Sequence, residues 1–158
     1  MSKLLLSAVL LALLTPSLAW ADVTAFVGVN GTPSLRGMKG FAGGIGLVIV
    51  GFEFEYSNTS EELDDLAPGL KTYMVNGLLQ TPFPIAGLQF YGTAGGGAYH
   101  ETLNEQSETN FGMNFGGGVK ANILGPLRLR LDYRVFTLRG APRHSKPQRF
   151  YAGLNLKF

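Results

Sequence analysis

The chain ends in the stretch Arg149-Phe-Tyr-Ala-Gly-Leu-Asn-Leu-Lys-Phe158, and this stretch decides the fold. Its residues alternate strictly between an apolar series and a series that is mostly polar or small. The apolar series consists of Phe150, Ala152, Leu154, Leu156 and Phe158. Successive side chains of a β-strand point to opposite faces of the sheet, so one face of this strand is apolar along its whole length. The pattern predicts a strand that separates two different solvents.

The opposite end of the chain is typical of a secretory signal peptide. Lys3 precedes the apolar stretch Leu4–Leu14, which is too short to span a bilayer. The tripeptide Ala19-Trp-Ala21 supplies the small residues at the positions that signal peptidase inspects. We therefore predict that residues 1–21 are a cleaved signal peptide and that residues 22–158 form a single exported domain.

The composition narrows the class of protein. Hydrophobic residues make up 46% of the chain and charged residues only 15%, below the proportion of about a quarter that is usual in soluble domains. No segment after the signal peptide is long and apolar enough for a transmembrane helix, and the 22 glycines disfavour long helices. A transmembrane β-barrel fits these features, because it is the other structure that satisfies its backbone hydrogen bonds within lipid.

Eight segments carry the alternation of a strand with two unlike faces. They are residues 22–30, 39–48, 51–57, 71–80, 87–100, 110–121, 127–138 and the terminal segment that starts at Arg149. The connections after the first, third, fifth and seventh segments are long and polar: residues 31–38, 58–70, 101–109 and 139–148. The other three are short, and this alternation is typical of outer-membrane barrels, which have short periplasmic turns and long outer loops. The prediction is an all-β fold, an eight-stranded antiparallel up-and-down transmembrane barrel with both termini in the periplasm.

The alternation alone leaves two arrangements open, a soluble lipocalin-like carrier with its apolar face inward and an inverted barrel with a polar lumen. The apolar face carries many aromatic side chains, whereas the lumen of an eight-stranded barrel has little space. The polar face carries glycines and charges of both signs, as an internally paired lumen requires. The charges expected to form this network are Glu53, Glu55, Arg128, Arg130, Asp132 and Arg134. Because the third and seventh strands face each other across such a barrel, we expect these side chains to pair and to plug the lumen.

Four internal motifs support a resemblance to a known family. They are Gly43-Gly-Ile-Gly46, Phe52-Glu-Phe-Glu-Tyr56, Tyr91-Gly-Thr-Ala-Gly-Gly-Gly97 and Leu131-Asp-Tyr-Arg134. Together with the signal peptide and the terminal strand, they make the whole mature chain resemble the small eight-stranded barrels of the OmpA-like and opacity-protein superfamily, which carry an outer membrane protein beta-barrel domain. The resemblance is specific for architecture. Members of the superfamily include adhesins, membrane–wall tethers and small pores.

The resemblance implies an integral outer-membrane protein, monomeric, with a structural or surface-interaction role such as adhesion or envelope integrity. Its surroundings would be outer-membrane lipids and lipopolysaccharide, and it would be inserted by the barrel-insertion machinery. The residues that would carry the C-terminal assembly signal are Tyr151, Leu154, Leu156 and Phe158. The last loop region is basic and is expected to meet lipopolysaccharide phosphates through Arg139, Arg143, Lys146 and Arg149.

A catalytic alternative also stays open. His144-Ser145, with Glu101 in another outer loop, resembles the lipid A deacylase barrels, which use a His-x-Ser arrangement near the end of a strand and a separate acid. Here the two residues are adjacent and lie between Pro142 and Pro147, a departure from that pattern, so we assign no catalytic residue. The chain has no cysteine and a net charge of only +2, and we expect no cofactor, no metal and no nucleic-acid partner.

Overall fold

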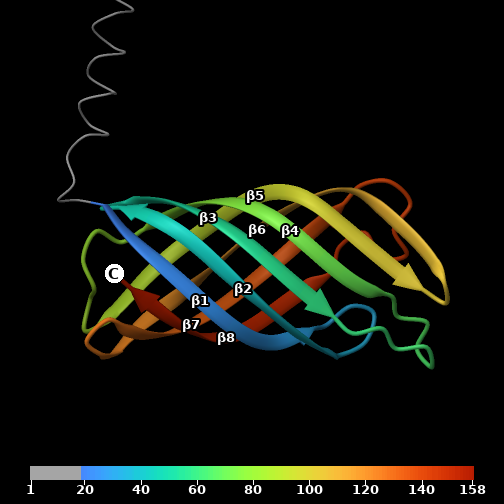
Figure 1. The fold of residues 1–158 in the computed structure, drawn as a ribbon, viewed down its shortest axis with the longest axis horizontal. Coiled ribbons are helices and arrows are strands. Elements are labelled where there is room, and N and C mark those ends of the chain that lie inside the picture. Colours follow the sequence, from blue (N-terminus) through green and yellow to red (C-terminus); the bar gives the residue numbers. More distant parts are fainter. Residues whose placement is uncertain (1–18) are drawn as a thin grey trace, which may run out of the picture.

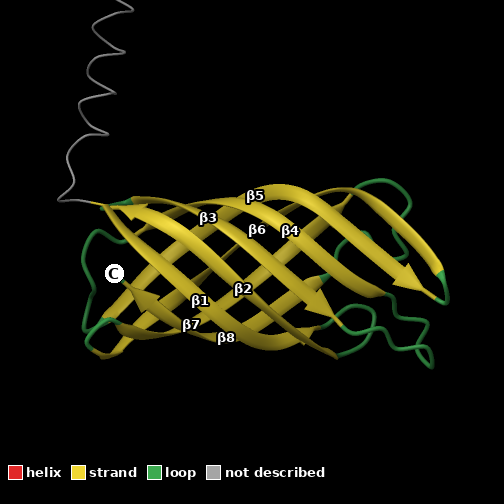
Figure 2. Cartoon of the chain, in the orientation of Figure 1, coloured by secondary structure: helices red, strands yellow, loops and turns green. Residues whose placement is uncertain are grey.

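The computed structural model describes residues 19–158. The predicted basic and apolar regions of the signal peptide, within residues 1–18, lie outside the described residues. No helix in the described part of the chain is long and apolar enough to cross a membrane. The described chain consists of strands joined by loops and turns (Figure 2).

The chain folds into a closed barrel in which every strand pairs with its sequence neighbours and β1 pairs with β8 (Figure 1). All pairings are antiparallel. The strands are β1 Ala19–Asn30, β2 Arg36–Leu47, β3 Val50–Thr59, β4 Gly69–Gln80, β5 Leu88–Leu103, β6 Gln106–Leu124, β7 Leu127–Leu138 and β8 Gln148–Lys157. The prediction of an eight-stranded antiparallel up-and-down barrel is confirmed, and most strands extend a few residues beyond the expected bounds.

Both ends of the described chain lie at the same end of the barrel (Figure 1). The backbone groups of Ala21 and Phe158 form two hydrogen bonds of 2.9 Å with each other at that end. We call this end the terminal end. The opposite end, which carries the connections after β1, β3, β5 and β7, we call the loop end.

The apolar faces of the strands point outward. Val27, Val75 and Phe115 are each more than 60% exposed, and Val23, Tyr73 and Phe111 on the same faces are more than 40% exposed. The inward face is instead polar: five acidic and six basic side chains are buried among the described residues. A soluble carrier with an apolar interior has the opposite arrangement, so the lipocalin-like alternative is wrong.

The connection between β5 and β6 corrects one prediction. Residues 101–109 were expected to form a long loop, but both strands continue through this segment and are joined by the two-residue turn Asn104–Glu105. Both turn residues have positive φ, at 49° and 68°, which is the backbone that a type I′ hairpin turn requires. The polar composition predicted a loop because a hairpin that projects into water needs no apolar face. The strict alternation of short and long connections is therefore wrong at this point.

Close contacts between strands explain the glycine at two inward-facing positions. A Cβ atom added at Gly97 would lie 1.9 Å from the carbonyl oxygen of Tyr73, and one added at Gly118 would lie 2.1 Å from that of Leu131. The Cβ at Gly118 would also approach the phenol oxygen of Tyr91 to 2.5 Å. Glycine therefore lets the neighbouring backbone approach closely at both sites, and at Gly118 it also leaves room for the Tyr91 side chain.

We expect Gly118→Ala to lower the free energy of unfolding by about 1–3 kcal/mol, since the added methyl group overpacks the wall beside Tyr91. The matched control is Gly43→Ala, because a Cβ at Gly43 meets nothing within 4 Å. The urea midpoint of each variant is measured in detergent micelles. The folded fraction at each urea concentration is read from the difference in gel migration between boiled and unboiled protein. Equal urea midpoints for the two variants would contradict this account of the inner wall.

Candidate functional site

A network of ion pairs crosses the lumen between β3 and β7. The Arg130 guanidinium pairs with both carboxylate oxygens of Glu53, and the second contact, from Nη2 to Oε1, is 3.2 Å. Arg134 Nη2 donates to the same Glu53 Oε1 at 3.1 Å. Both arginine side chains are fully buried. Since an isolated buried charge is costly, the shared carboxylate offsets the desolvation of two cations at once.

Asp132 and Tyr91 complete the central part of this network. Asp132 accepts hydrogen bonds from Arg134 Nε at 2.8 Å and from Arg130 Nη2 at 3.2 Å. The Tyr91 hydroxyl accepts from Arg130 Nε at 2.7 Å and donates to Asp132 Oδ2. The tyrosine thus links a cation to an anion and fixes the relative orientation of the two side chains.

Arg149 belongs to the lumen and not to the outer basic loop. It starts the inward-facing series of β8, and its side chain is 2% exposed and pairs with Glu55. Its Nη1 donates to Ser57 at 2.8 Å, and Arg134 Nη1 lies 3.1 Å from the other oxygen of Glu55. The expected contact between Arg149 and lipopolysaccharide is therefore wrong. The same two-residue alternation that identified Phe150 as outward-facing would have placed Arg149 inside.

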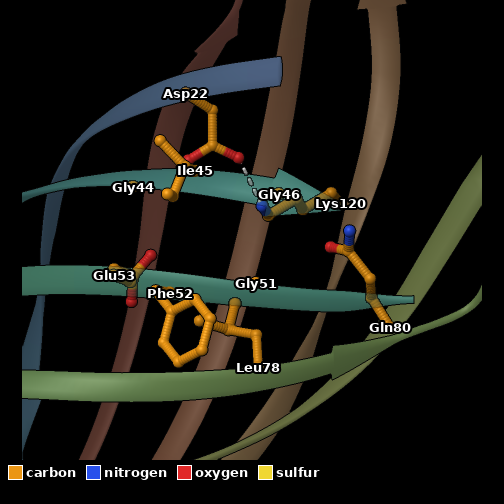
Figure 3. Close-up of a pocket in the computed structure, with 10 residues that line it drawn as sticks. All are labelled: Asp22, Gly44, Ile45, Gly46, Gly51, Phe52, Glu53, Leu78, Gln80 and Lys120. Atoms are coloured by element: carbon orange, nitrogen blue, oxygen red, sulfur yellow. Dashed lines mark hydrogen bonds and ion pairs between the residues drawn. The ribbon is translucent and has the colours of Figure 1, made fainter. Parts of the chain in front are cut away.

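A second charged cluster lies near the terminal end, and the sequence did not predict it. Asp22 Oδ2 accepts from Lys120 Nζ at 2.7 Å and from Arg128 Nη2 at 3.1 Å. Arg128 also donates to Asn155 and Gln89, so it pairs with Asp22 and contacts neither Glu53 nor Glu55 within the described network. Figure 3 shows Asp22 and Lys120 above Glu53, around a cavity of about 10 Å³, room for one water.

Two clusters of buried apolar side chains pack in the lumen beside the charges and toward the loop end. One cluster contains Leu70, Met74, Tyr99, Phe136 and Leu138, and the other contains Phe26, Met38, Ala42 and Tyr151. Phe26 and Tyr151 stack with their ring centroids 4.1 Å apart. The Arg149 guanidinium lies 4.7 Å from the ring centroid of Phe136, so the aromatic cluster is continuous with the ion-pair network.

The remaining basic residues of the last loop are exposed at the loop end: Arg139, Arg143 and Lys146. The loop is held by its backbone against the β5–β6 hairpin. The amides of Ala141 and Arg143 donate to Glu108 and Glu101 at 2.7 and 2.9 Å. Its basic side chains are therefore presented from a supported loop.

The three residues of the catalytic alternative are only partly brought together. His144 and Glu101 line one small cavity of about 10 Å³ with Arg36. Ser145 is exposed, and no hydrogen bond in the described chain joins it to His144. Glu101 already accepts the amide of Arg143. This arrangement provides no activated serine nucleophile. No group of three potential metal ligands occurs among residues 19–158.

The four residues proposed as an assembly signal divide between the two faces of β8. Leu154, Leu156 and Phe158 are exposed on the outward face, whereas Tyr151 is fully buried in the lumen. The outward row is thus the part of this strand that another protein or a lipid could contact in the folded barrel.

We expect Arg130→Met to lower the free energy of unfolding by about 3–5 kcal/mol, because it removes one of the two guanidinium groups that compensate the buried Glu53 carboxylate. Arg143→Met in the loop is the matched control and should change it by less than about 0.5 kcal/mol, as is usual for exposed sites. Urea midpoints in detergent give both values. If Glu53→Gln combined with Arg130→Met is no more stable than Arg130→Met alone, the two side chains do not interact as described.

Comparison with known proteins supports the architecture. The family model described as "Outer membrane protein beta-barrel domain" matches residues 11–158. No curated protein sequence matches the chain. The N-terminal β-barrel domain of Pseudomonas aeruginosa OprF is 14% identical with a TM-score of 0.68, covering 88% of this chain and 97% of that domain. Neisserial surface protein A (NspA) is 13% identical with a TM-score of 0.70, covering 89% of this chain and 97% of that protein.

A third similar structure is Ail, the attachment invasion locus protein of Yersinia pestis. It is 17% identical with a TM-score of 0.56, covering 89% of this chain and 99% of that protein. At these identities the likeness concerns the fold alone, and it agrees with a closed eight-stranded barrel. The family match extends over nearly the whole sequence, and the chain belongs to the outer membrane protein beta-barrel domain family.

Proposed function

We propose that this protein is a non-enzymatic surface barrel of the outer membrane, with a closed lumen and with its loop end exposed on the cell. Its role is structural or interaction-based, in adhesion or in envelope integrity. Membership of the family implies an outer-membrane location. The observation that carries the rest is the ion-pair network across the lumen, which leaves the loops as the part of the protein that is free to meet a partner.

The lumen has the character of a plug. Glu53, Arg130 and Arg134 span it from β3 to β7, and the apolar clusters pack beside these charges and toward the loop end. The cavity beside the charges near the terminal end has a volume of about 10 Å³. Moving a hydrated ion through this section requires breaking several charge-assisted hydrogen bonds together. Bulk solute passage is therefore not the proposed function.

The loop end carries charge of both signs. Arg139, Arg143 and Lys146 are exposed on the last loop, and Glu61 and Glu62 are exposed on the loop after β3. A surface with separate basic and acidic segments suits recognition of charged partners, including lipopolysaccharide phosphates. Two similar structures bear names that refer to the surface or to attachment, which supports a surface-interaction role for this chain.

Purified protein in a planar lipid bilayer should show no steady ion conductance, because the cross-lumen pairs occupy the path. The matched variant Glu53→Ser with Arg130→Ser removes one pair at constant net charge, and we expect intermittent conductance from it. Gel migration before and after boiling confirms that both proteins are folded. Steady conductance of the unmodified protein, proportional to the amount inserted, would contradict a closed lumen.

Cysteine labelling tests the orientation. The chain has no cysteine, so Lys146→Cys at the loop end and Ile85→Cys at the terminal end each introduce a single exposed thiol. A membrane-impermeant maleimide should label the Lys146→Cys variant in intact cells and the Ile85→Cys variant only after the outer membrane is opened. The reverse result would mean that the terminal end faces outward and would overturn the proposed surface role of the loops.

A further inference from the structure

A row of polar side chains crosses β2 to β6 on the outward face, close to the loop end. The cross-strand register aligns its members one after another. They are Lys39, Asn58, Lys71, His100 and Thr109, and we call them the Lys39–Thr109 row. The row runs around the barrel wall and is separate from the basic loop, which joins β7 to β8.

Lys39 and Lys71 have no counterpart elsewhere on the wall. Within residues 19–158 they are the two formally charged side chains at outward-facing strand positions, and both are exposed. Neither forms an ion pair with a carboxylate in the described chain. Every other charged side chain of the described strands lies on the face that points into the lumen, including those near the loop end. These two exposed cations have no internal partner and are therefore available to an anion from outside the protein.

An aromatic row lies directly below, two residues nearer the middle of each strand. Phe41, Tyr56 and Tyr73 are aligned by the same register. The Phe41 and Tyr56 ring centroids are 5.5 Å apart, and those of Tyr56 and Tyr73 are 5.1 Å apart. Amphipathic rings favour the boundary between lipid and water. The lysines thus stand just outside that boundary, at the level of lipid headgroups.

The height of the wall agrees with this placement. From Leu47 to Lys39 the backbone of β2 runs about 27 Å at roughly 3.4 Å per residue. With a strand tilt of about 40°, the rise is about 21 Å, close to the apolar band of about 25 Å of outer-membrane barrels. Lys39 therefore lies where the hydrocarbon ends, and its flexible side chain can extend further into the headgroup region.

We propose that the Lys39–Thr109 row binds the phosphate groups of a lipid A-type glycolipid, with the acyl chains against the apolar wall below. Lys39 and Lys71 are two strands apart, roughly 10 Å at the usual strand spacing, which suits a headgroup that carries more than one phosphate. Asn58 lies between them in the register and supplies an amide donor. A lysine ammonium recognises phosphate as a compact charge through charge-assisted hydrogen bonds.

The two ends of the wall differ, and the difference indicates which membrane leaflet contains the bound lipid. At the terminal end the outward positions of β2, β3 and β4 are Leu47, Val50 and Leu79, all exposed, and no lysine accompanies them. The phosphate-binding row is thus confined to the leaflet at the loop end. This assignment rests on the proposed orientation, in which that leaflet is the outer one and its phosphorylated lipid is lipid A.

The experiment measures how strongly the folded barrel retains lipid in vesicles of phosphatidylcholine. The vesicles also contain bisphosphorylated lipid A, dephosphorylated lipid A or phosphatidylglycerol. Protein and bound lipid are extracted together and quantified. The test variant is Lys39→Gln with Lys71→Gln, and Lys39→Arg with Lys71→Arg is the control that keeps the charge. A loop variant, Arg143→Gln with Lys146→Gln, measures the contribution of the basic loop separately. Gel migration before and after boiling confirms that each variant is folded.

We expect the unmodified protein to retain bisphosphorylated lipid A in preference to the other two lipids. The glutamine variant should lose this preference, by roughly five-fold for each lysine removed, while the arginine variant keeps it. Retention by the glutamine variant would overturn the site, and loss in the loop variant alone would move the contact to the loop. Equal retention of phosphatidylglycerol by the unmodified protein would overturn the choice of lipid A. Since the vesicle assay does not depend on orientation in cells, its failure is distinguishable from failure of the cysteine-labelling test.

Discussion

The structure depends on the pairing of Arg130 and Arg134 with acidic side chains inside the barrel. Two guanidinium groups without solvent contact are stable only if carboxylates surround them, and Glu53, Asp132 and Glu55 do so from two strands. The pairing fixes which faces of β3 and β7 point inward. A shift of either strand by one residue would place these charges on the lipid side and the outward apolar side chains in the lumen. The network therefore sets the strand register as well as closing the lumen.

The outer wall meets a different requirement. Its side chains need only be apolar in the middle and amphipathic at the rim, and no individual contact is as constrained as those in the lumen. The wall accordingly combines large residues such as Phe52 and Phe115 with small ones such as Gly77 and Ala94. Only at the rim near the loops does charge appear, at Lys39 and Lys71. Chemical specificity on this surface is thus limited to a narrow ring.

The sequence predicted most of the fold because strand alternation is a local property. The terminal strand from Phe150 to Phe158 and the alternation of β7 were sufficient to identify the two faces and the central charge network. Side-chain pairings between strands far apart in the sequence are harder to predict from local alternation. Asp22 meets Lys120 and Arg128 because barrel closure brings β1 near β6 and β7. Arg149 already lies in the expected terminal strand, and its place in the alternation next to the outward Phe150 puts it in the lumen with Glu55, whereas the expectation grouped it with the basic loop by charge alone. The β5–β6 hairpin was missed because a polar hairpin in water and a polar loop have the same composition.

The support of the last loop by the β5–β6 hairpin has a consequence for sequence divergence. Its contacts to the hairpin are made by main-chain amides: Arg139 to the carbonyl of Phe111, Ala141 to Glu108 and Arg143 to Glu101. A main-chain amide is present whatever the side chain, proline excepted. The loop can therefore exchange its exposed side chains without losing its position, while the hairpin carboxylates that receive these amides cannot be exchanged as freely. The last loop can thus vary in sequence, while the β5–β6 hairpin that supports it is more constrained.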